Sequence, residues 1–342
     1  MPRPFVSKEP QLEDYWRGII LFGRNVASYK FALAKSLLEL QPKSGELIKL
    51  GDLAPIYSRH LSEHIKNSDK QGTSNSSKLL DGCRKYNSGE IIQDELTEVT
   101  IRYGFNNVID TFHVVGQGEV PKRFYIDERK ENKGIRITDE FTNLLNRQQF
   151  VNLPQEVEAR WRLVETAWEL GVSRSLVSIG YDKNSESLFA LDKRKRRKSV
   201  TGSRDALNGY QKGKCFYCFT DIYIDVSSSL YPDVDHFFPH TLKQQGFSGI
   251  IDGIWNLVLS CQKCNRGAGG KFDRIPTIRL LERLHRRNEF LISSHHPLRE
   301  TLIQQTGASE MQRSEFLNGF HSKAWVTLIH QWEPEEKDAP YF

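Results

Sequence analysis

The chain reads Lys214-Cys-Phe-Tyr-Cys218, then Val234-Asp-His-Phe-Phe-Pro239, then Asn256-Leu-Val-Leu-Ser-Cys-Gln-Lys-Cys-Asn265. Two Cys-x-x-Cys pairs therefore enclose one long segment of sequence. Each pair presents two thiolates from a single turn, and structural Zn²⁺ sites use four such ligands arranged in a tetrahedron. We predict a structural zinc site that closes this segment into one module, formed by Cys215, Cys218, Cys261 and Cys264.

The composition of the 342-residue chain is typical of a folded protein with two or three domains. Hydrophobic residues make up 38% and aromatic residues 11%, which excludes a disordered chain. The chain has no stretch of about 18 apolar residues, so no transmembrane helix is predicted. The polar N-terminus lacks the apolar segment of a signal peptide. We therefore expect a cytoplasmic protein without a membrane partner. In the reducing cytoplasm, paired Cys-x-x-Cys motifs are expected to bind a metal rather than form disulfides.

Basic residues are distributed unevenly along the chain. The net charge is +5, from 48 basic and 43 acidic residues, so nucleic-acid binding is permitted but not required. Just before the cysteine module, six basic residues follow one another: Lys193, Arg194, Lys195, Arg196, Arg197 and Lys198. They could neutralise DNA phosphates or form a solvated linker. Their position next to the module favours phosphate contacts.

Apolar periodicity predicts a mixed α+β chain with a helix-rich first half. Helical spacing covers 14–40, 56–65 and 154–170, and alternation predicts a β-hairpin over 176–191. The polar segment 67–78 is expected to be a loop. We divide the chain into an N-terminal recognition or regulatory region at 1–192, a basic linker at 193–204, the cysteine module at 205–272 and a helical C-terminal tail at 273–342.

Asp235 and His236 lie between the two cysteine pairs, on a short β-like run. A phosphodiester hydrolase needs a base that works near neutral pH, which suits histidine. It also needs a hard divalent ion held by oxygen ligands, which suits Asp and Asn. Because neighbouring strand residues point to opposite sides, we expect Asp235 and His236 to flank a phosphate from two directions. Asn256 could fix the tautomer of His236 through a ring nitrogen, and Asn265 directly follows the last cysteine.

In combination, these motifs resemble the HNH endonuclease family, in its four-cysteine, zinc-bearing subgroup with a ββα-metal nuclease core. The resemblance covers the module at 205–272 and rests on Cys-x-x-Cys, Asp-His-x-x-Pro and Asn-Leu-x-x-x-Cys-x-x-Cys-Asn. By position it implies His236 as the general base and Asp235 with Asn265 as ligands of a catalytic Mg²⁺ or Mn²⁺ ion. Asn256 would tie the loop and orient His236, and the four cysteines would hold structural Zn²⁺.

The chain departs from the family pattern in two places. The usual Asn-x-x-Lys ending is here Asn265-Arg-Gly-Ala-Gly-Gly-Lys271, and its glycines predict a helix that is short or broken. Arg266 and Lys271 are candidate phosphate contacts. Because the helix is expected to be short or broken, the positions of these two side chains stay open. His240 stands where relatives commonly carry a small polar residue. It could join the metal or phosphate shell, but a supporting or surface role is the expectation.

The resemblance implies metal-dependent hydrolysis of double-stranded DNA, with nicking as the primary product because one ββα-metal site cuts one strand per event. It is compatible with an effector nuclease of a bacterial anti-phage defence or restriction system that acts with companion proteins. The alternative is a zinc-stabilised nucleic-acid-binding protein that does not cut. Elsewhere, His60 and His64 have helical spacing but no third ligand nearby, so we expect them at the surface.

Overall fold

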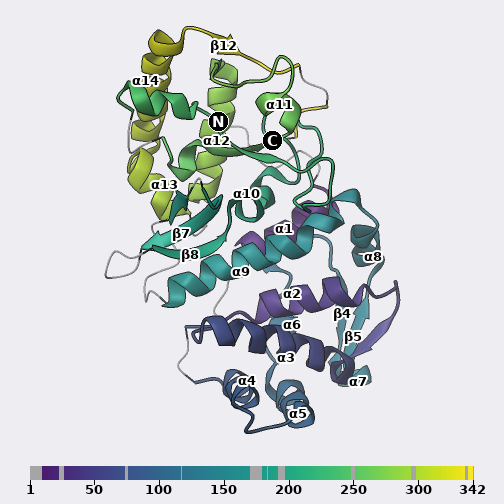
Figure 1. The fold of residues 1–342 in the computed structure, drawn as a ribbon. Helices are drawn as coiled ribbons and strands as arrows, with labels where there is room; N and C mark the ends of the chain where they lie inside the picture. Colours follow the sequence, from purple (N-terminus) through teal and green to yellow (C-terminus); the bar gives the residue numbers. More distant parts are fainter. Residues whose placement is uncertain are drawn as a thin grey trace. The chain divides into compact units, whose positions relative to one another are not determined.

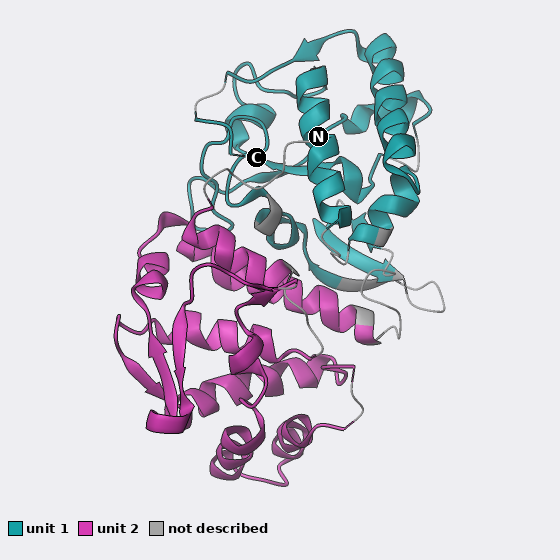
Figure 2. Ribbon diagram, turned by 180° about the vertical axis from the view of Figure 1, so that it is seen from behind, with its two compact units in different colours: residues 1–9, 172–342 teal, residues 10–171 magenta. Residues whose placement is uncertain are grey.

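Helices predominate over strands in this chain (Figure 1). The structure, a computed structural model, describes residues 10–22, 27–73, 76–116, 118–169, 179–182, 184–191, 197–247, 251–293, 298–335 and 338–341. The chain divides into two compact units: an N-terminal unit, Pro10–Gly171, and a C-terminal unit that includes Val172–Phe342 (Figure 2). With several small sheets among the helices, the fold is mixed α+β, as the sequence predicts.

The N-terminal unit packs its helices around aromatic side chains. Trp16 meets the ring of Phe124 edge-on at 5.3 Å between centroids, and Phe31 stacks on Trp161 at 5.9 Å. All four are fully or almost fully buried, so they anchor the core. The helices are α1 (Leu12–Phe22), α2 (Tyr29–Leu40), α3 (Leu50–Asn67), α4 (Lys78–Ser88), α5 (Gln93–Tyr103), α6 (Val108–Thr111), α7 (Arg129–Asn132), α8 (Asp139–Leu145), η1 (Gln148–Asn152) and α9 (Leu153–Glu169).

Short strands complete this unit. β1 (Leu47–Lys49), β5 (Gly134–Ile137) and β4 (Tyr125–Glu128) form one antiparallel sheet in that order, and β2 (Val114–Val115) pairs with β3 (Gly118–Glu119). The helical segment expected over 14–40 contains two helices, α1 and α2. Helices α4 and α5 did not stand out in the sequence because much of their surface is exposed and polar.

His60 and His64 are buried, so the expectation that they lie at the surface is wrong. The ring of His64 stacks on Trp161, with 3.5 Å between centroids. Its two nitrogens lie 2.8 Å from Glu165 and 3.1 Å from Glu158, both on α9. Helical spacing alone could not reveal these carboxylates, because they lie far along the sequence.

The C-terminal unit begins with a three-stranded sheet in the order β6 (Ile179–Asp182), β7 (Ser187–Leu191) and β8 (Arg197–Gly202). The predicted hairpin is present in β6 and β7, which are antiparallel. Because β7 also pairs with β8, the hairpin belongs to the C-terminal unit, and the units divide after Gly171 rather than at 192. Residues 197–202 form a strand instead of a linker, and 192–196 lie outside the described residues.

The remaining elements of this unit follow in order. A long segment separates the antiparallel partners β9 and β10, and the short strands β11 and β12 pair in parallel. The elements are α10 (Ser203–Gln211), β9 (Asp233–His236), η2 (His240–Gln245), η3 (Ile254–Asn256), β10 (Leu257–Ser260), α11 (Gln262–Arg266), β11 (Ile275–Pro276), α12 (Ile278–Ser293), α13 (Arg299–Thr306), α14 (Glu310–Leu328) and β12 (Gln331–Trp332).

Helix α12 completes the core of the cysteine module, although the sequence suggested a separate tail from 273. Arg283 donates to the carbonyl oxygens of Phe216 and Tyr217, at 2.6 and 2.8 Å. Arg287 donates to those of Leu257 and Trp255, at 2.8 and 2.9 Å. Burial lowers the pKa of Arg287 to about 9. These bonds tie both cysteine-bearing stretches to one helix, so the module extends beyond 272.

None of the described helices is long and apolar enough to cross a membrane.

Candidate metal centre and histidine site

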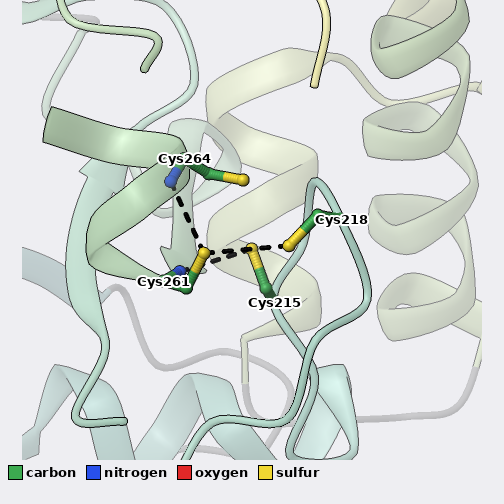
Figure 3. A group of neighbouring side chains, drawn as sticks. All are labelled: Cys215, Cys218, Cys261 and Cys264. Carbon is green, nitrogen blue, oxygen red and sulfur yellow. Dashed lines mark hydrogen bonds between the residues drawn. The ribbon is translucent and has the colours of Figure 1, made fainter. Parts of the chain in front are cut away.

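Four cysteines from two distant stretches meet at one point (Figure 3). Their sulfur atoms all lie within 4.8 Å of one another, and the Sγ atoms of Cys218 and Cys261 are 3.7 Å apart. Two ligands come from the loop after α10, and two come from the start and first turn of α11. This grouping can hold a metal ion such as Zn²⁺ in a closed four-sulfur site, which agrees with the predicted ligand set: Cys215, Cys218, Cys261 and Cys264.

Local backbone geometry presents the sulfurs. After the first pair, Phe219 adopts a left-handed conformation with φ of 60°, and its N–H donates to the carbonyl of Cys215 at 3.1 Å. At the second pair, the N–H of Cys264 donates to Sγ of Cys261 at 3.5 Å, which caps α11. Hydrogen bonds with Cys215 and Cys264 lower the pKa of Cys261 to about 7, although the contact with Cys218 opposes that shift. A bound cation would favour the thiolate forms further.

Asp235 is buried beside the cysteine cluster and already has two partners. The hydroxyl of Tyr217 donates to Oδ2 at 2.6 Å, and the ammonium of Lys271 lies 3.2 Å from Oδ1. Burial raises the pKa of Asp235, although the charge of Lys271 and both hydrogen bonds oppose that rise. The register of the strands confirms that Asp235 faces a different side from His236, since Asp235 is opposite Val258 and His236 is opposite Leu257.

Lys271 is 1% exposed, which corrects its prediction as a phosphate contact. Its ammonium donates to the carbonyl of His236 at 3.0 Å as well as pairing with Asp235. The preceding glycines make this possible. Helix α11 ends at Arg266, as its composition predicted, and a Cβ on Gly270 would lie 2.9 Å from the carbonyl oxygen of Lys263. Only a chain without that Cβ can turn back tightly enough to bury Lys271.

Asn265 and Arg266 both bond to Asp233, which the sequence analysis missed. The amide of Asn265 donates to Oδ2 of Asp233 at 3.0 Å, and Nε of Arg266 donates to the same oxygen at 2.9 Å. Asp233 lies two residues before Asp235, and strand alternation puts both on one face. That periodicity was the signal that could have found it. The Arg266 side chain remains 59% exposed.

His236 faces a second carboxylate, Asp252. Its Nε2 lies 3.2 Å from Oδ1 of Asp252, and Nε2 of His240 lies 3.5 Å from the same atom. The ammonium of Lys243 lies 2.6 Å from the other oxygen. Burial disfavours the Asp252 anion, but the hydrogen bond from Lys243 and the surrounding positive charges outweigh it and lower the pKa of Asp252. Asp252 is therefore an ionised neighbour of His236, and His240 supports the pair.

Asn256 ties the loop, as expected, but it does not bond to the ring of His236. Its Oδ1 accepts from the N–H of Phe238 at 2.8 Å. Its Nδ2 donates to the carbonyls of Phe238 and Ile251, at 3.1 and 2.8 Å. Among the described residues, these backbone groups are the hydrogen-bond partners of both the oxygen and the nitrogen of the amide. The carboxylate of Asp252 replaces it beside the His236 ring.

No family model, curated protein or solved structure matches this chain. Within the basic run, Lys193, Arg194, Lys195 and Arg196 lie outside the described residues, whereas Arg197 and Lys198 begin β8 and pair with Leu191 and Ala190 through the backbone.

Proposed function

We propose that this chain is a metal-dependent endonuclease of the HNH type, which hydrolyses phosphodiester bonds in DNA. One observation carries the proposal: the antiparallel pair β9–β10 leads directly into α11, with Asp235 and His236 on β9 and Asn265 on α11 directly after Cys264 of the cysteine cluster. Two strands followed by a helix are the arrangement that a ββα-metal core needs. The four cysteines would hold Zn²⁺, which stabilises the fold of the module.

His236 would act as the general base. The carboxylate of Asp252, with Oδ1 3.2 Å from Nε2, would stabilise the positive charge that the imidazole gains with a proton. His236 is 7% exposed, so bound DNA would meet a largely desolvated ring. The base and its carboxylate partner match the requirements for abstracting a proton from water near neutral pH.

Asp235 and Asn265 are the proposed ligands of Mg²⁺ or Mn²⁺, and Asp233 joins them because it contacts Asn265 directly. The donor set fits a hard divalent ion, since its oxygens come from carboxylate and amide groups. Such an ion would supply positive charge against the phosphate and the leaving 3′-oxygen. Two basic residues flank the proposed metal site. Lys271 compensates the buried charge of Asp235, and Arg266 offers an exposed cation beside Asp233.

A second candidate function is zinc-stabilised nucleic-acid binding without cleavage. The observation that favours it is that Asp235 is buried, with one oxygen on Tyr217 and the other facing Lys271. A carboxylate neutralised in this way needs no metal ion for its own stability. Under this alternative, the exposed basic residues bind phosphate and the His236–Asp252 pair is structural.

A plasmid-nicking assay with the full chain separates the two functions. We expect Mg²⁺ or Mn²⁺ to support conversion of supercoiled DNA to nicked circles. His236→Ala should slow nicking by about 10²-fold or more, because general-base catalysis contributes that much. His330→Ala is the matched control, since His330 is an exposed histidine of the same unit and should leave the rate unchanged.

Two results would contradict the nuclease proposal. If the wild-type chain retards DNA in a gel but leaves it uncut with either metal, the binding function is favoured. If His236→Ala nicks as fast as the wild type, the activity comes from another site or a contaminant. A role in anti-phage defence or restriction, with companion proteins and double-stranded DNA as the target, is the biological setting that fits a nuclease of this kind.

A further inference from the structure

A buried lysine lines a cavity in the N-terminal unit. The cavity has a volume of about 460 Å³ and lies among the first turn of α2, helix α6 and strand β2. Lys30 is only 4% exposed, although lysine is among the residues least often buried. The residues that line it include Tyr29, Lys30, Asn107, Val108, Thr111 and Val114.

Among the described residues, no carboxylate compensates the charge of Lys30. Its ammonium donates one long hydrogen bond, 3.3 Å, to the carbonyl of Val114, and no carboxylate pairs with it among the described residues. Burial alone lowers the pKa of Lys30 to about 8. An ammonium has three donors, so this one retains hydrogen-bonding capacity in a place where an unpaired charge is costly.

His113 near the cavity carries no charge that could pair with Lys30. His113 is buried, and its Nε2 accepts a hydrogen bond from the N–H of Phe124 at 3.0 Å. Burial, and after it the charges of Arg123 and Lys30, lower the pKa of His113 to about 3. His113 therefore stays neutral near physiological pH. Arg123 is paired with Glu119, at 2.5 Å between Nη2 and the carboxylate, so among the described lining residues Lys30 is the charged group that can attract an anion.

The walls of the cavity combine apolar and polar groups. The polar residues Asn107 and Thr111 are exposed, whereas Lys30 is buried, so the lysine lies on the inner side of the cavity and the polar residues at its mouth. Tyr29 and Val108 add aromatic and apolar surface. A mostly apolar pocket of this size with one convergent charge is typical of sites for small organic molecules.

We propose that this cavity binds a small organic anion, whose carboxylate or phosphate pairs with Lys30 while its apolar part contacts Tyr29 and the valines. The ligand supplies the negative charge that no described residue provides for Lys30. The site belongs to the N-terminal unit alone and does not depend on the proposed nuclease function. It gives this unit a chemical role as a binding module for an anionic small molecule.

Calorimetric titration of the full chain tests the site with phenyl phosphate, benzoate and neutral benzyl alcohol. We expect one of the two anions to bind at least tenfold more tightly than the alcohol, and the stronger anion identifies the charged group that the site prefers. Lys30→Met should lower the affinity for that anion by about tenfold or more, as expected for loss of a buried charge partner. Lys35→Met is the control on the same helix, since Lys35 pairs with Glu158 instead, and it should bind as the wild type does.

The folding of Lys30→Met is measured separately by thermal unfolding without ligand. Its midpoint should not fall below that of the wild type, because methionine removes an uncompensated buried charge. If this variant does not fold, chemical labelling of the wild type decides. Phenyl phosphate, or benzoate if it binds more tightly, should slow acetylation of Lys30, mapped by mass spectrometry, severalfold while Lys35 is unaffected. Equal binding of all three probes, unchanged affinity in Lys30→Met, or no protection of Lys30 would each overturn the proposal.

Discussion

Lys271 and Asp235 form a buried ion pair beside the cysteine cluster. Removing one partner of such a pair leaves an uncompensated charge, which typically destabilises a protein by about 3 kcal/mol or more. We therefore expect Lys271→Met to lower the free energy of unfolding by that amount. The double variant Lys271→Met/Asp235→Asn should recover part of the loss, because neither charge then remains alone.

Denaturant unfolding of the two single variants and the double variant measures this coupling. Arg266→Met is the control, since its side chain is 59% exposed and its pair with Asp233 is expected to contribute little. Strictly additive losses in the double variant would show that Lys271 and Asp235 do not stabilise each other. The same variants inform the metal site, because Asp235→Asn should also abolish nicking if Asp235 binds the catalytic ion.

At the scale of elements, His64 joins α3 to α9. Burial lowers the pKa of His64, but its hydrogen bonds to Glu158 and Glu165 outweigh burial and raise the pKa above the usual 6.5. A raised pKa means that its contribution to stability is complete below pH 6.5 and is lost as the pH rises through the folded-state value. His60 has the opposite sign, because burial lowers its pKa to about 4.

Because these two histidines oppose each other, the effect of His64 is best measured as a difference. We expect the loss of stability caused by His64→Gln to be larger at pH 5 than at pH 8, in thermal or denaturant unfolding of the full chain. The control His330→Gln should show no such pH dependence, since that histidine is exposed. An equal loss at both pH values would mean that the charged ring does not hold α3 to α9.

Across the whole C-terminal unit, the four-cysteine cluster joins stretches that lie far apart in the sequence. Structural zinc contributes directly to folding, so its removal should unfold the module. We expect about one zinc ion per chain by elemental analysis, as one four-sulfur site implies. Strong chelators should expose the backbone of this unit to hydrogen exchange.

The ligand assignment is tested with two cysteine variants. Cys261→Ser should lose the metal and Cys83→Ala should retain it, because Cys83 lies in the N-terminal unit. Full zinc content in Cys261→Ser would contradict the ligand assignment.

The glycine-rich stretch after Asn265 shows where sequence reasoning reached its limit. Its composition was enough to predict that α11 ends early, because glycine is a poor helix former. It could not show that the chain then turns back, with the N–H of Lys271 donating to the carbonyl of Cys264 at 2.7 Å. The position of the Lys271 ammonium depends on that turn, so a residue predicted at the surface is buried.

The sequence by itself indicated the four cysteines that can hold a metal ion and the opposite directions of Asp235 and His236, whereas the order of strands and helix around them was implied by the family resemblance. The cysteine grouping and the alternation follow from short-range spacing, since turn and strand periodicities act over a few residues. Only the tertiary structure decided which partners these side chains have: Lys271 and Tyr217 for Asp235, Asp252 for His236, and backbone groups for Asn256. Such pairings join distant segments, and their positions depend on the packing of the whole unit rather than on any local pattern.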